Sequence, residues 1–315
     1  MDVNASGLHT VFGPVPSRRF GRSLGVDVIP KKLCSMDCVY CEVGRTTMRD
    51  IIRKEYIPTS WILRELALRL ALRPPIDCVT FSGSGEPTLH AGLGHMICMV
   101  KGMTDVPVVV LTNGSLLWKE DVRQDLLAAD IVSPSLDAVS EDIFRRVDRP
   151  HPRLSAVQVI DGMCKFRKEF KGTYLLEMLF VSGINDGDEE VLRLRDAAKR
   201  IAPDKIQVNT ILRPPAESWV KPVDHERLLK IRDMLGPTAE IIAPTSLKAG
   251  VPSMNMSQDD VLALLRRRAM TVDEIAEAAN IDRQAAETTL AVLRVAGLAT
   301  LVDFGGRQYF DATRD

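Results

Sequence analysis

The chain has 315 residues, of which 45% are hydrophobic and 26% are charged, and this composition excludes a disordered or collagen-like protein. Its 41 Lys and Arg residues against 42 Asp and Glu residues give a net charge of -1, so a basic character typical of nucleic-acid-binding proteins is absent from the chain as a whole. No apolar run reaches the roughly 18–20 residues that cross a bilayer. The N-terminus MDVNASGLHTVFG shows no signal peptide, so we expect a cytoplasmic protein.

Short β-rich runs alternate with helical patterns through most of the chain. The expected strands are Leu24–Ile29, Cys78–Ser82, Val108–Thr112, Ile131–Leu136, Tyr174–Val181 and Lys205–Leu212. The expected helices are Ser60–Leu72, Leu89–Met103, Lys119–Ala128, Ser155–Phe170, Glu189–Ile201 and His225–Leu235. Such alternation predicts a parallel sheet with right-handed crossovers. Six β/α units predict a partial or complete TIM-like barrel, with the chemistry at the C-terminal ends of the strands.

The end of the chain has a different pattern, beginning with a Pro-, Ser- and Gly-rich stretch that predicts a linker. After it we expect helices at Gln258–Arg267, Val272–Ala279 and Arg283–Val295, and a hairpin around Gly305-Gly306. A helix, a helix-turn-helix and a hairpin are typical of a winged-helix domain. The sequence thus predicts a barrel domain at 1–243, a linker at 244–257 and a winged-helix-like domain at 258–315.

Charge distinguishes the two ends of the chain. From Ser257 to Asp315 there are seven Arg and no Lys against ten acidic residues, which disfavours DNA binding and favours docking of a protein or substrate, or a lid. From Ser17 to Lys54 there are nine basic and four acidic residues. This segment is either an ordinary solvated surface or a positive rim for an anionic substrate or an acidic electron donor.

Three of the six cysteines, Cys34, Cys38 and Cys41, form a CxxxCxxC motif after the first expected strand. Thiolates suit soft metals, so the motif indicates either an iron–sulfur cluster or a zinc site completed by a distant His. Three cysteines bind three irons of a [4Fe–4S] cube and leave the fourth open, unlike four-cysteine ferredoxin sites. The other three have no cluster spacing and are expected to be buried small hydrophobes: Cys78, Cys98 and Cys164.

The CxxxCxxC motif, with Tyr40 before its last cysteine and on a loop after the first strand of a β/α barrel, resembles the radical S-adenosylmethionine (radical SAM) superfamily. The resemblance implies an oxygen-sensitive enzyme with a [4Fe–4S] cluster and S-adenosylmethionine (SAM). In that family the open iron binds the methionyl amine and carboxylate, and one electron cleaves the sulfonium to a 5′-deoxyadenosyl radical, which abstracts hydrogen from the substrate. The protein positions and shields these cofactors.

Further motifs at the expected strand ends match the same family in order. Ser82-Gly-Ser-Gly-Glu86 is similar to the family's Gly-Gly-Glu element, with Ser84 in place of its first Gly. Glycines let backbone approach a ligand closely, and a carboxylate complements an ammonium. The SAM-binding residues that the resemblance implies are Gly83, Ser84, Gly85, Glu86, Asn113, Ser135 and Asp137. Simple turns at Ser82–Glu86 and at Asn113-Gly114 are the alternative.

The sequence gives fewer indications of the residues that bind the substrate. Gln207, Asn209 and Ile211 alternate on the last barrel strand and share a face, which we expect to point inward. Arg213 follows that strand and can meet a carboxylate of cofactor or substrate. The candidate substrate residues are Arg18, Arg19, Gln207 and Arg213. A purely structural role for the polar pair on the strand is the alternative.

The segments around Arg18-Arg19 and Arg149-Pro-His-Pro resemble the branch that contains the wyosine-type tRNA synthetases. This implies as substrate a tRNA base or another anionic molecule, such as a metabolite, and as reductant a flavodoxin or ferredoxin. Two other function classes remain open. One is an iron–sulfur redox-sensing transcription regulator that reads DNA with the winged helix, and the other is a zinc-stabilised binding module without catalysis.

Overall fold

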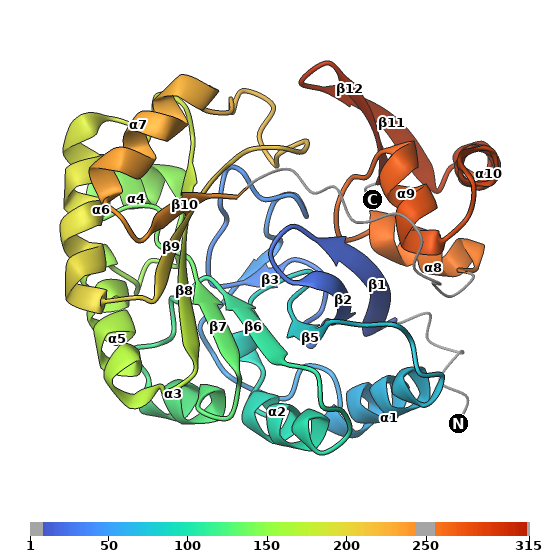
Figure 1. Cartoon of the computed structure of the whole chain (residues 1–315), viewed down its shortest axis with the longest axis horizontal. Coiled ribbons are helices and arrows are strands. Elements are labelled where there is room, and N and C mark those ends of the chain that lie inside the picture. Colours follow the sequence, from blue (N-terminus) through green and yellow to red (C-terminus); the bar gives the residue numbers. More distant parts are fainter. Residues whose placement is uncertain (1–8, 243–255, 314–315) are drawn as a thin grey trace.

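The structure is a computed structural model that describes residues 9–242 and 256–313. An eight-stranded sheet in the order β1-β2-β5-β6-β7-β8-β9-β10 forms its centre (Figure 1). Its strands are β1 (Val11–Ser17), β2 (Gly21–Val26), β5 (Cys78–Phe81), β6 (Val108–Thr112), β7 (Ile131–Pro134), β8 (Thr173–Phe180), β9 (Lys205–Thr210) and β10 (Ala239–Ile241). Strand β1 is antiparallel to β2, and the other neighbouring strands pair in parallel.

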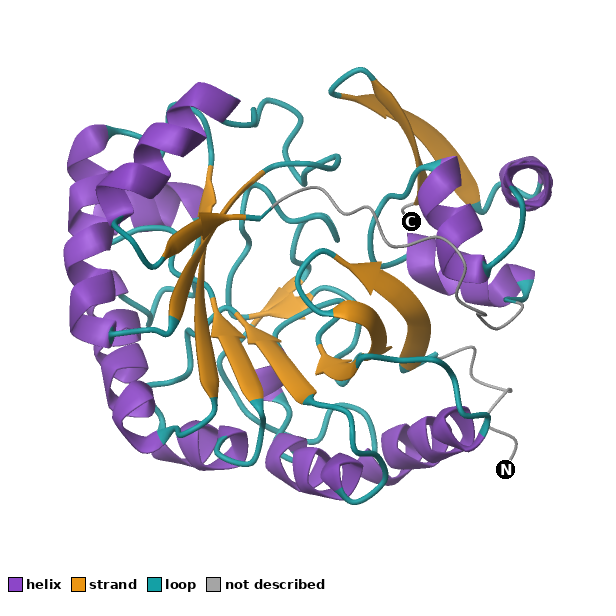
Figure 2. Cartoon of the chain, viewed as in Figure 1, coloured by secondary structure: helices purple, strands orange, loops and turns teal. Residues whose placement is uncertain are grey.

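The six strands expected from the sequence are the consecutive neighbours from β2 to β9, which confirms the parallel α/β sheet. The helices lie around the outer face of the curved sheet (Figure 2). They are α1 (Thr59–Ala71), α2 (Leu93–Lys101), α3 (Glu120–Leu126), α4 (Glu141–Val147), α5 (Ala156–Glu169), α6 (Asp188–Ile201) and α7 (His225–Leu235). Because the order begins at β1 and ends at β10, the sheet is open between these strands and the barrel is partial.

Both edge strands were absent from the sequence prediction. Strand β1 contains Gly13, Pro14 and Pro16, residues that predict a turn and not a strand. Proline has no N–H to donate and is tolerated in a strand mainly at a sheet edge, which is where β1 lies. Strand β10 has three residues, too few to show an alternating pattern.

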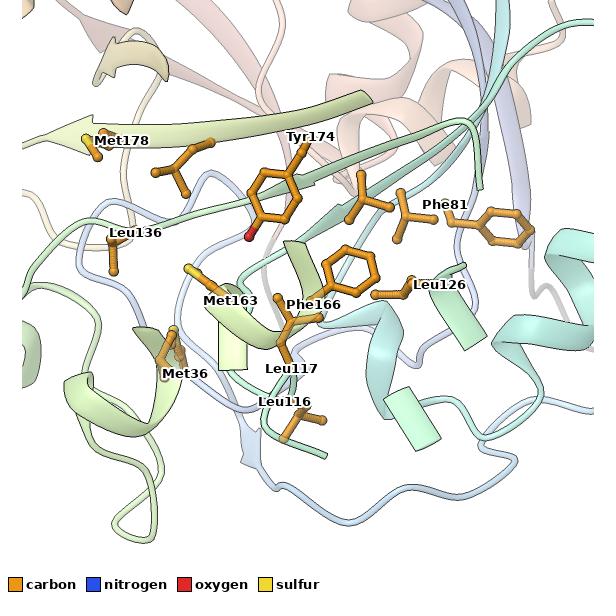
Figure 3. Packing of buried hydrophobic residues seen from close by; sticks show 14 of the residues in the cluster. Met36, Phe81, Leu116, Leu117, Leu126, Leu136, Met163, Phe166, Tyr174 and Met178 are labelled. Atoms are coloured by element: carbon orange, nitrogen blue, oxygen red, sulfur yellow. The ribbon is translucent and has the colours of Figure 1, made fainter. Parts of the chain in front are cut away.

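The main core fills the space between the sheet and its helices (Figure 3). Tyr174 of β8 and Phe166 of α5 are fully buried, with ring centroids 5.9 Å apart, and Phe166 stacks on Phe170 at 4.9 Å. Helix α5 presents this apolar face to the sheet because Val159, Met163 and Phe166 recur at helical spacing. The packing fixes the strands, and thereby the loops at their C-terminal ends.

The C-terminal segment, residues 256–313, has a hydrophobic cluster of its own. It consists of α8 (Gln258–Leu265), α9 (Val272–Ala279), α10 (Arg283–Val295) and the antiparallel pair β11 (Ala299–Phe304) and β12 (Arg307–Ala312). Ser257 and Thr271 each form a capping box, which explains where α8 and α9 begin. The expected hairpin is present. Of the expected linker at 244–257, only residues 256–257 lie within the described part.

The C-terminal segment covers the free edge at β1, whose Phe12 and Val15 pack on its cluster. Arg267 donates to the His9 carbonyl at 2.6 Å and lies 4.2 Å from the centroid of the Phe12 ring. Arg69 of α1 pairs with Asp260 at 3.1 Å. Exposed edges invite pairing with other chains, so this contact protects the sheet. In Figure 1 the C-terminal elements, in orange and red, lie on the β1 side.

Candidate active site

The three motif cysteines lie on one loop that follows β2. Cys34 ends the short strand β3 (Leu33–Cys34), which pairs with β4 (Met48–Arg49) and closes the loop. Asp37 accepts from the Thr46 N–H at 2.7 Å, and the Thr46 hydroxyl donates to the Met36 carbonyl at 2.7 Å. These bonds draw the two ends of the loop together and hold the thiols in one region.

The segment after α4 supports this loop, a contact that the sequence analysis missed. The N–H of Asp37 donates to the Asp148 carbonyl at 3.0 Å, and the N–H of Val39 donates to the Val147 carbonyl at 2.9 Å. The N–H of His151 donates to the Ser35 carbonyl at 2.8 Å. The motif Arg149-Pro-His-Pro thus belongs to the frame of the cysteine loop.

The three thiols are half-buried and unpaired. Burial and the nearby Glu86 raise the pKa of Cys34 to about 12, and burial also raises the pKa values of Cys38 and Cys41. Among the described residues, no His, Cys, Asp or Glu group converges closely enough for a single metal ion. Three thiols on one loop supply the donor set that a [4Fe–4S] cube with one open iron needs. Because the pKa values of these thiols are raised, the thiolate forms require the positive charge of a metal centre beside them.

The loop after β5 lies directly against the cysteine loop. The N–H of Lys32 donates to the Ser84 carbonyl at 2.8 Å, and the N–H of Glu86 donates to the Leu33 carbonyl at 3.2 Å. A Cβ on Gly85 would lie 1.9 Å from the Leu33 oxygen, so only glycine allows this approach. Asp27 accepts from the backbone N–H and the hydroxyl of Ser84 at 3.0 and 2.6 Å.

Glu86 joins two strand ends. It is only 2% exposed, and its Oε1 accepts from the Thr88 N–H and from the hydroxyls of Thr88 and Thr112 at 3.0, 2.6 and 2.6 Å. Its Oε2 accepts from the Asn113 N–H at 2.7 Å. Burial raises the pKa of Glu86 above its usual value despite these four bonds. Oε2 can accept a further hydrogen bond. The bond from the methionyl amine of SAM to this oxygen stays a prediction.

Asn113 brings an amide to the cysteines. Its Nδ2 donates to Cys34 Sγ at 3.4 Å and to the Ser35 hydroxyl at 2.9 Å. Its Oδ1 accepts from the Ser115 N–H at 3.0 Å, which fixes the amide orientation. The end of β6 is therefore in contact with the loop that carries the motif.

Ser135 and Asp137 line a small cavity together with Tyr40 and Asn113. Asp137 is buried, accepts from the Tyr40 hydroxyl, and accepts from the Leu179 N–H at 2.8 Å. Burial raises the pKa of Asp137 to about 7. The structure thus brings these two predicted residues to the same strand-end cavity beside the cysteine loop, with Asp137 already bonded to the protein.

A polar cluster fills the inside of the barrel. Arg19 donates to Glu177 at 2.8 Å, to Ser133 at 3.2 Å and to Gln207 at 3.3 Å. Asn209 donates to Glu177 at 3.0 Å and accepts from Arg18 at 3.2 Å. The inward direction predicted for Gln207 and Asn209 is confirmed.

The sequence predicts that Arg213 meets a carboxylate of cofactor or substrate. The structure instead places this side chain against groups of the protein. It forms an ion pair with Glu274 of α9, donates to the Ala269 carbonyl at 2.8 Å, and lies 3.6 Å from Glu42. Tyr309 of β12 also donates to the Leu212 carbonyl at 2.9 Å. The chain after β9 therefore contacts the C-terminal segment.

Many charges of the expected basic rim have partners in the structure. Arg22 pairs with Asp77 at 3.0 Å, Arg45 with Glu217 at 2.7 Å and Arg53 with Asp121 at 2.5 Å. The rim is thus less positive than its composition predicts. Among the other cysteines, Cys78 is buried and Cys164 half-buried, but Cys98 is exposed because it lies on the outer side of α2.

Sequence reasoning missed four residues of this region: Asp27, Asp148, Glu177 and Arg268. One of them carried a signal, since Glu177 is the only charge in the apolar run of β8 (TYLLEMLF). A charge inside a buried strand needs a partner and so indicates a polar site. The other three gain their partners only through long-range contacts.

Comparisons with known proteins agree with this geometry. Residues 28–195 match the Radical SAM superfamily domain. A UPF0026 protein of Methanocaldococcus jannaschii is 39% identical over 239 residues, covering 75% of this chain and 73% of that protein. A protein of Brachyspira hyodysenteriae named GTPase Obg is 37% identical over 290 residues, 91% of this chain. The chain spans only 43% of the length of that relative.

Solved structures show the same fold. The structure of TYW1 with a lysine-pyruvate adduct bound aligns with a TM-score of 0.52 at 18% identity, covering 68% of this chain and 72% of that one. A radical SAM methyltransferase from Sphaerobacter thermophilus aligns with a TM-score of 0.52 at 16% identity, covering 70% and 65%. These matches lend no support to a transcription regulator. The chain is a radical SAM enzyme, uses a [4Fe–4S] cluster and SAM, and belongs to the radical SAM superfamily.

Proposed function

We propose that Cys34, Cys38 and Cys41 hold the [4Fe–4S] cluster and that the strand-end residues around them hold SAM. The observation that carries the proposal is the placement of three half-buried thiols on one tied loop, with the Asn113 amide 3.4 Å from Cys34 Sγ. When bound, the cluster supplies the electron that cleaves a carbon–sulfur bond of SAM. The protein positions both groups and keeps water away.

The cofactor residues have distinct tasks in this proposal. The backbone at Gly83–Gly85 borders the cysteine loop and approaches the methionyl part of SAM, with Glu86 Oε2 accepting from its amine. Asn113 orients Cys34. Ser135 and Asp137 face the ribose or carboxylate from the cavity that they line.

The substrate residues in this proposal are Arg18, Arg19, Gln207 and Arg213, which lie in or near the polar lumen of the barrel. The substrate is an anionic molecule or a tRNA base, the latter by fold similarity to TYW1. A reductant is required. The excess of basic over acidic residues from Ser17 to Lys54 favours an acidic flavodoxin or ferredoxin.

We also propose a winged-helix-like domain at 258–315, separated from the barrel domain at 1–243 by a linker. Three helices followed by an antiparallel hairpin support it. None of the helices in residues 9–242 and 256–313 combines the length and the apolar character that a membrane span needs. The six unpaired cysteines fit a reducing compartment, such as the cytoplasm, and an oxygen-sensitive cluster.

The test is anaerobic reconstitution with iron and sulfide, followed by dithionite and SAM. We expect about four irons per chain and release of 5′-deoxyadenosine or methylthioadenosine, and the product identifies the bond that breaks. Alanine at Cys34, Cys38 or Cys41 should abolish both iron retention and product. The matched control is Cys98→Ala, on the exposed side of α2, which should change neither. Full product formation by a motif variant would contradict the assignment.

A further inference from the structure

The contact between the barrel and the C-terminal segment contains three arginines from separate parts of the chain. Arg18 lies in the turn after β1, Arg213 follows β9, and Arg268 lies between α8 and α9. The positive charge of Arg213 acts on both of the other guanidinium groups, and that of Arg18 acts on Arg268. The three side chains therefore share one region.

Only one of the three has a carboxylate at ion-pair distance within the described residues. Arg213 pairs with Glu274 and, at 3.6 Å, with Glu42. Arg18 donates to the Asn209 amide oxygen at 3.2 Å, and Arg268 donates to the Pro16 carbonyl at 3.4 Å. A guanidinium has five N–H donors, so most of the donors on these two side chains are unused.

These two charges are held in an unfavourable environment. Burial lowers the pKa of Arg18, and burial together with Arg213 lowers the pKa of Arg268 to about 10. The neighbouring acids do not cancel the charge, because Glu42, Glu177 and Glu274 face these three arginines and also Arg19. Both side chains are half-buried. Charge withdrawn from water without a counter-ion is costly, and such violations concentrate at functional sites.

Their position is beside the cysteine loop. Glu42 directly follows Cys41, and its charge acts on both Arg18 and Arg268. The C-terminal segment contacts β1 through Arg268 and the chain after β9 through Glu274 and Tyr309. It thus packs beside this region, where both guanidinium groups are half-buried, and this partial burial favours a small ligand over a polymer.

We propose that Arg18 and Arg268 together bind the phosphate or carboxylate group of a small substrate, so that the C-terminal segment contributes directly to the substrate site. The inference rests on the proposed function and names the substrate class for the same site. Planar guanidinium groups match both kinds of oxyanion through paired hydrogen bonds.

The test uses the full chain, reconstituted anaerobically, and measures dissociation constants for inorganic phosphate and for acetate by calorimetry at low salt. We expect one of the two to bind, which identifies the anion class. Arg18→Gln and Arg268→Gln should each weaken that binding at least tenfold. The matched control is Arg266→Gln, an exposed arginine at the end of α8, which should stay within twofold.

Several results would overturn the proposal: no binding of either anion, equal weakening by Arg266→Gln, or an unchanged constant in both Gln variants. Tighter binding of an RNA oligonucleotide that depends on Arg18 would replace the small ligand by nucleic acid. If a Gln variant does not fold, Arg268→Lys keeps the charge without the planar fork and should lose the anion in part. Failure of the proposed function is distinguishable, because it shows as absent SAM cleavage by the wild type.

Discussion

Individual side chains around the site act mainly as connectors between strand ends. Glu86 illustrates this, because its four donors come from the loop after β5 and from the end of β6. Glu177 does the same inside the barrel for Arg19 and Asn209. Each carboxylate therefore has a structural task in addition to any contact with a ligand.

Replacing Glu86 by Gln should destabilise the protein by about 2 kcal/mol, because one oxygen becomes an N–H₂ group that faces other donors. SAM affinity should fall as well, since the loop after β5 loses its tie to β6. Urea unfolding and equilibrium SAM binding measure the two effects. An unchanged unfolding midpoint would contradict the hydrogen-bond pattern described for this side chain.

Glu177 predicts a pH dependence of stability. Burial raises its pKa, but Arg19, Asn209 and Arg18 outweigh burial and hold the pKa below its usual value. The carboxylate therefore stabilises the fold above the unfolded pKa of about 4.3, and this contribution is lost as pH falls through the folded value.

Glu177→Gln should accordingly cost about 3 kcal/mol at pH 7, because Arg19 is left without its partner at 14% side-chain exposure. The difference from the wild type should shrink on acidification below about pH 4. Melting temperatures between pH 3 and 7 provide the check. A difference that stays constant across this range would show that the charge of Glu177 is not responsible.

At the level of elements, the site depends on two loops that pack backbone to backbone. The loop after β5 touches the cysteine loop at Leu33, and the segment after α4 supports the same loop from another side. Gly85 is the closest point of this packing. Small changes in either loop should therefore affect the thiols.

Gly85→Ala should destabilise the protein by about 2 kcal/mol or more and lower iron retention, since its Cβ would meet the Leu33 oxygen at 1.9 Å. Gly187→Ala is the matched control, because no atom lies within 4 Å of a Cβ built there. Thermal melting and iron analysis compare the variants. Equal behaviour of the two would refute the close approach.

At the scale of the whole molecule, the C-terminal segment contacts the barrel at both borders of its open side. It covers the β1 edge and holds the chain after β9 through Arg213 and Tyr309. The open side of the sheet is thus bridged by residues far away in the sequence.

Arg213→Gln should loosen the contact, because Glu274 loses its ion-pair partner in a largely buried setting. Backbone amides of β1 and α9 should then exchange hydrogen faster, while those of β6 keep their protection. Hydrogen-exchange mass spectrometry detects the difference. Arg294→Gln, an exposed position on α10, serves as control, and a similar change in both variants would exclude a specific role for Arg213.

Features that depend on a local pattern of residues were predictable before the chain folds. These are the six parallel strands from β2 to β9, the helices packed on them except α4, the CxxxCxxC loop and the superfamily. Hydrophobic periodicity and motif spacing are properties of neighbouring residues and so are readable without a fold. The strand-end positions of Asn113, Ser135 and Asp137 followed from the same pattern.

The side chains that meet across the molecule were not predictable from such patterns and are known only from the folded chain. It placed Arg213 against Glu274, Asp148 beside the cysteine loop, and the proline-containing β1 at the sheet edge under the C-terminal segment. These contacts join residues many tens of positions apart, and their energies depend on burial and charge that exist only in the folded chain. The contact between the barrel and the C-terminal segment therefore cannot be predicted from the local sequence pattern.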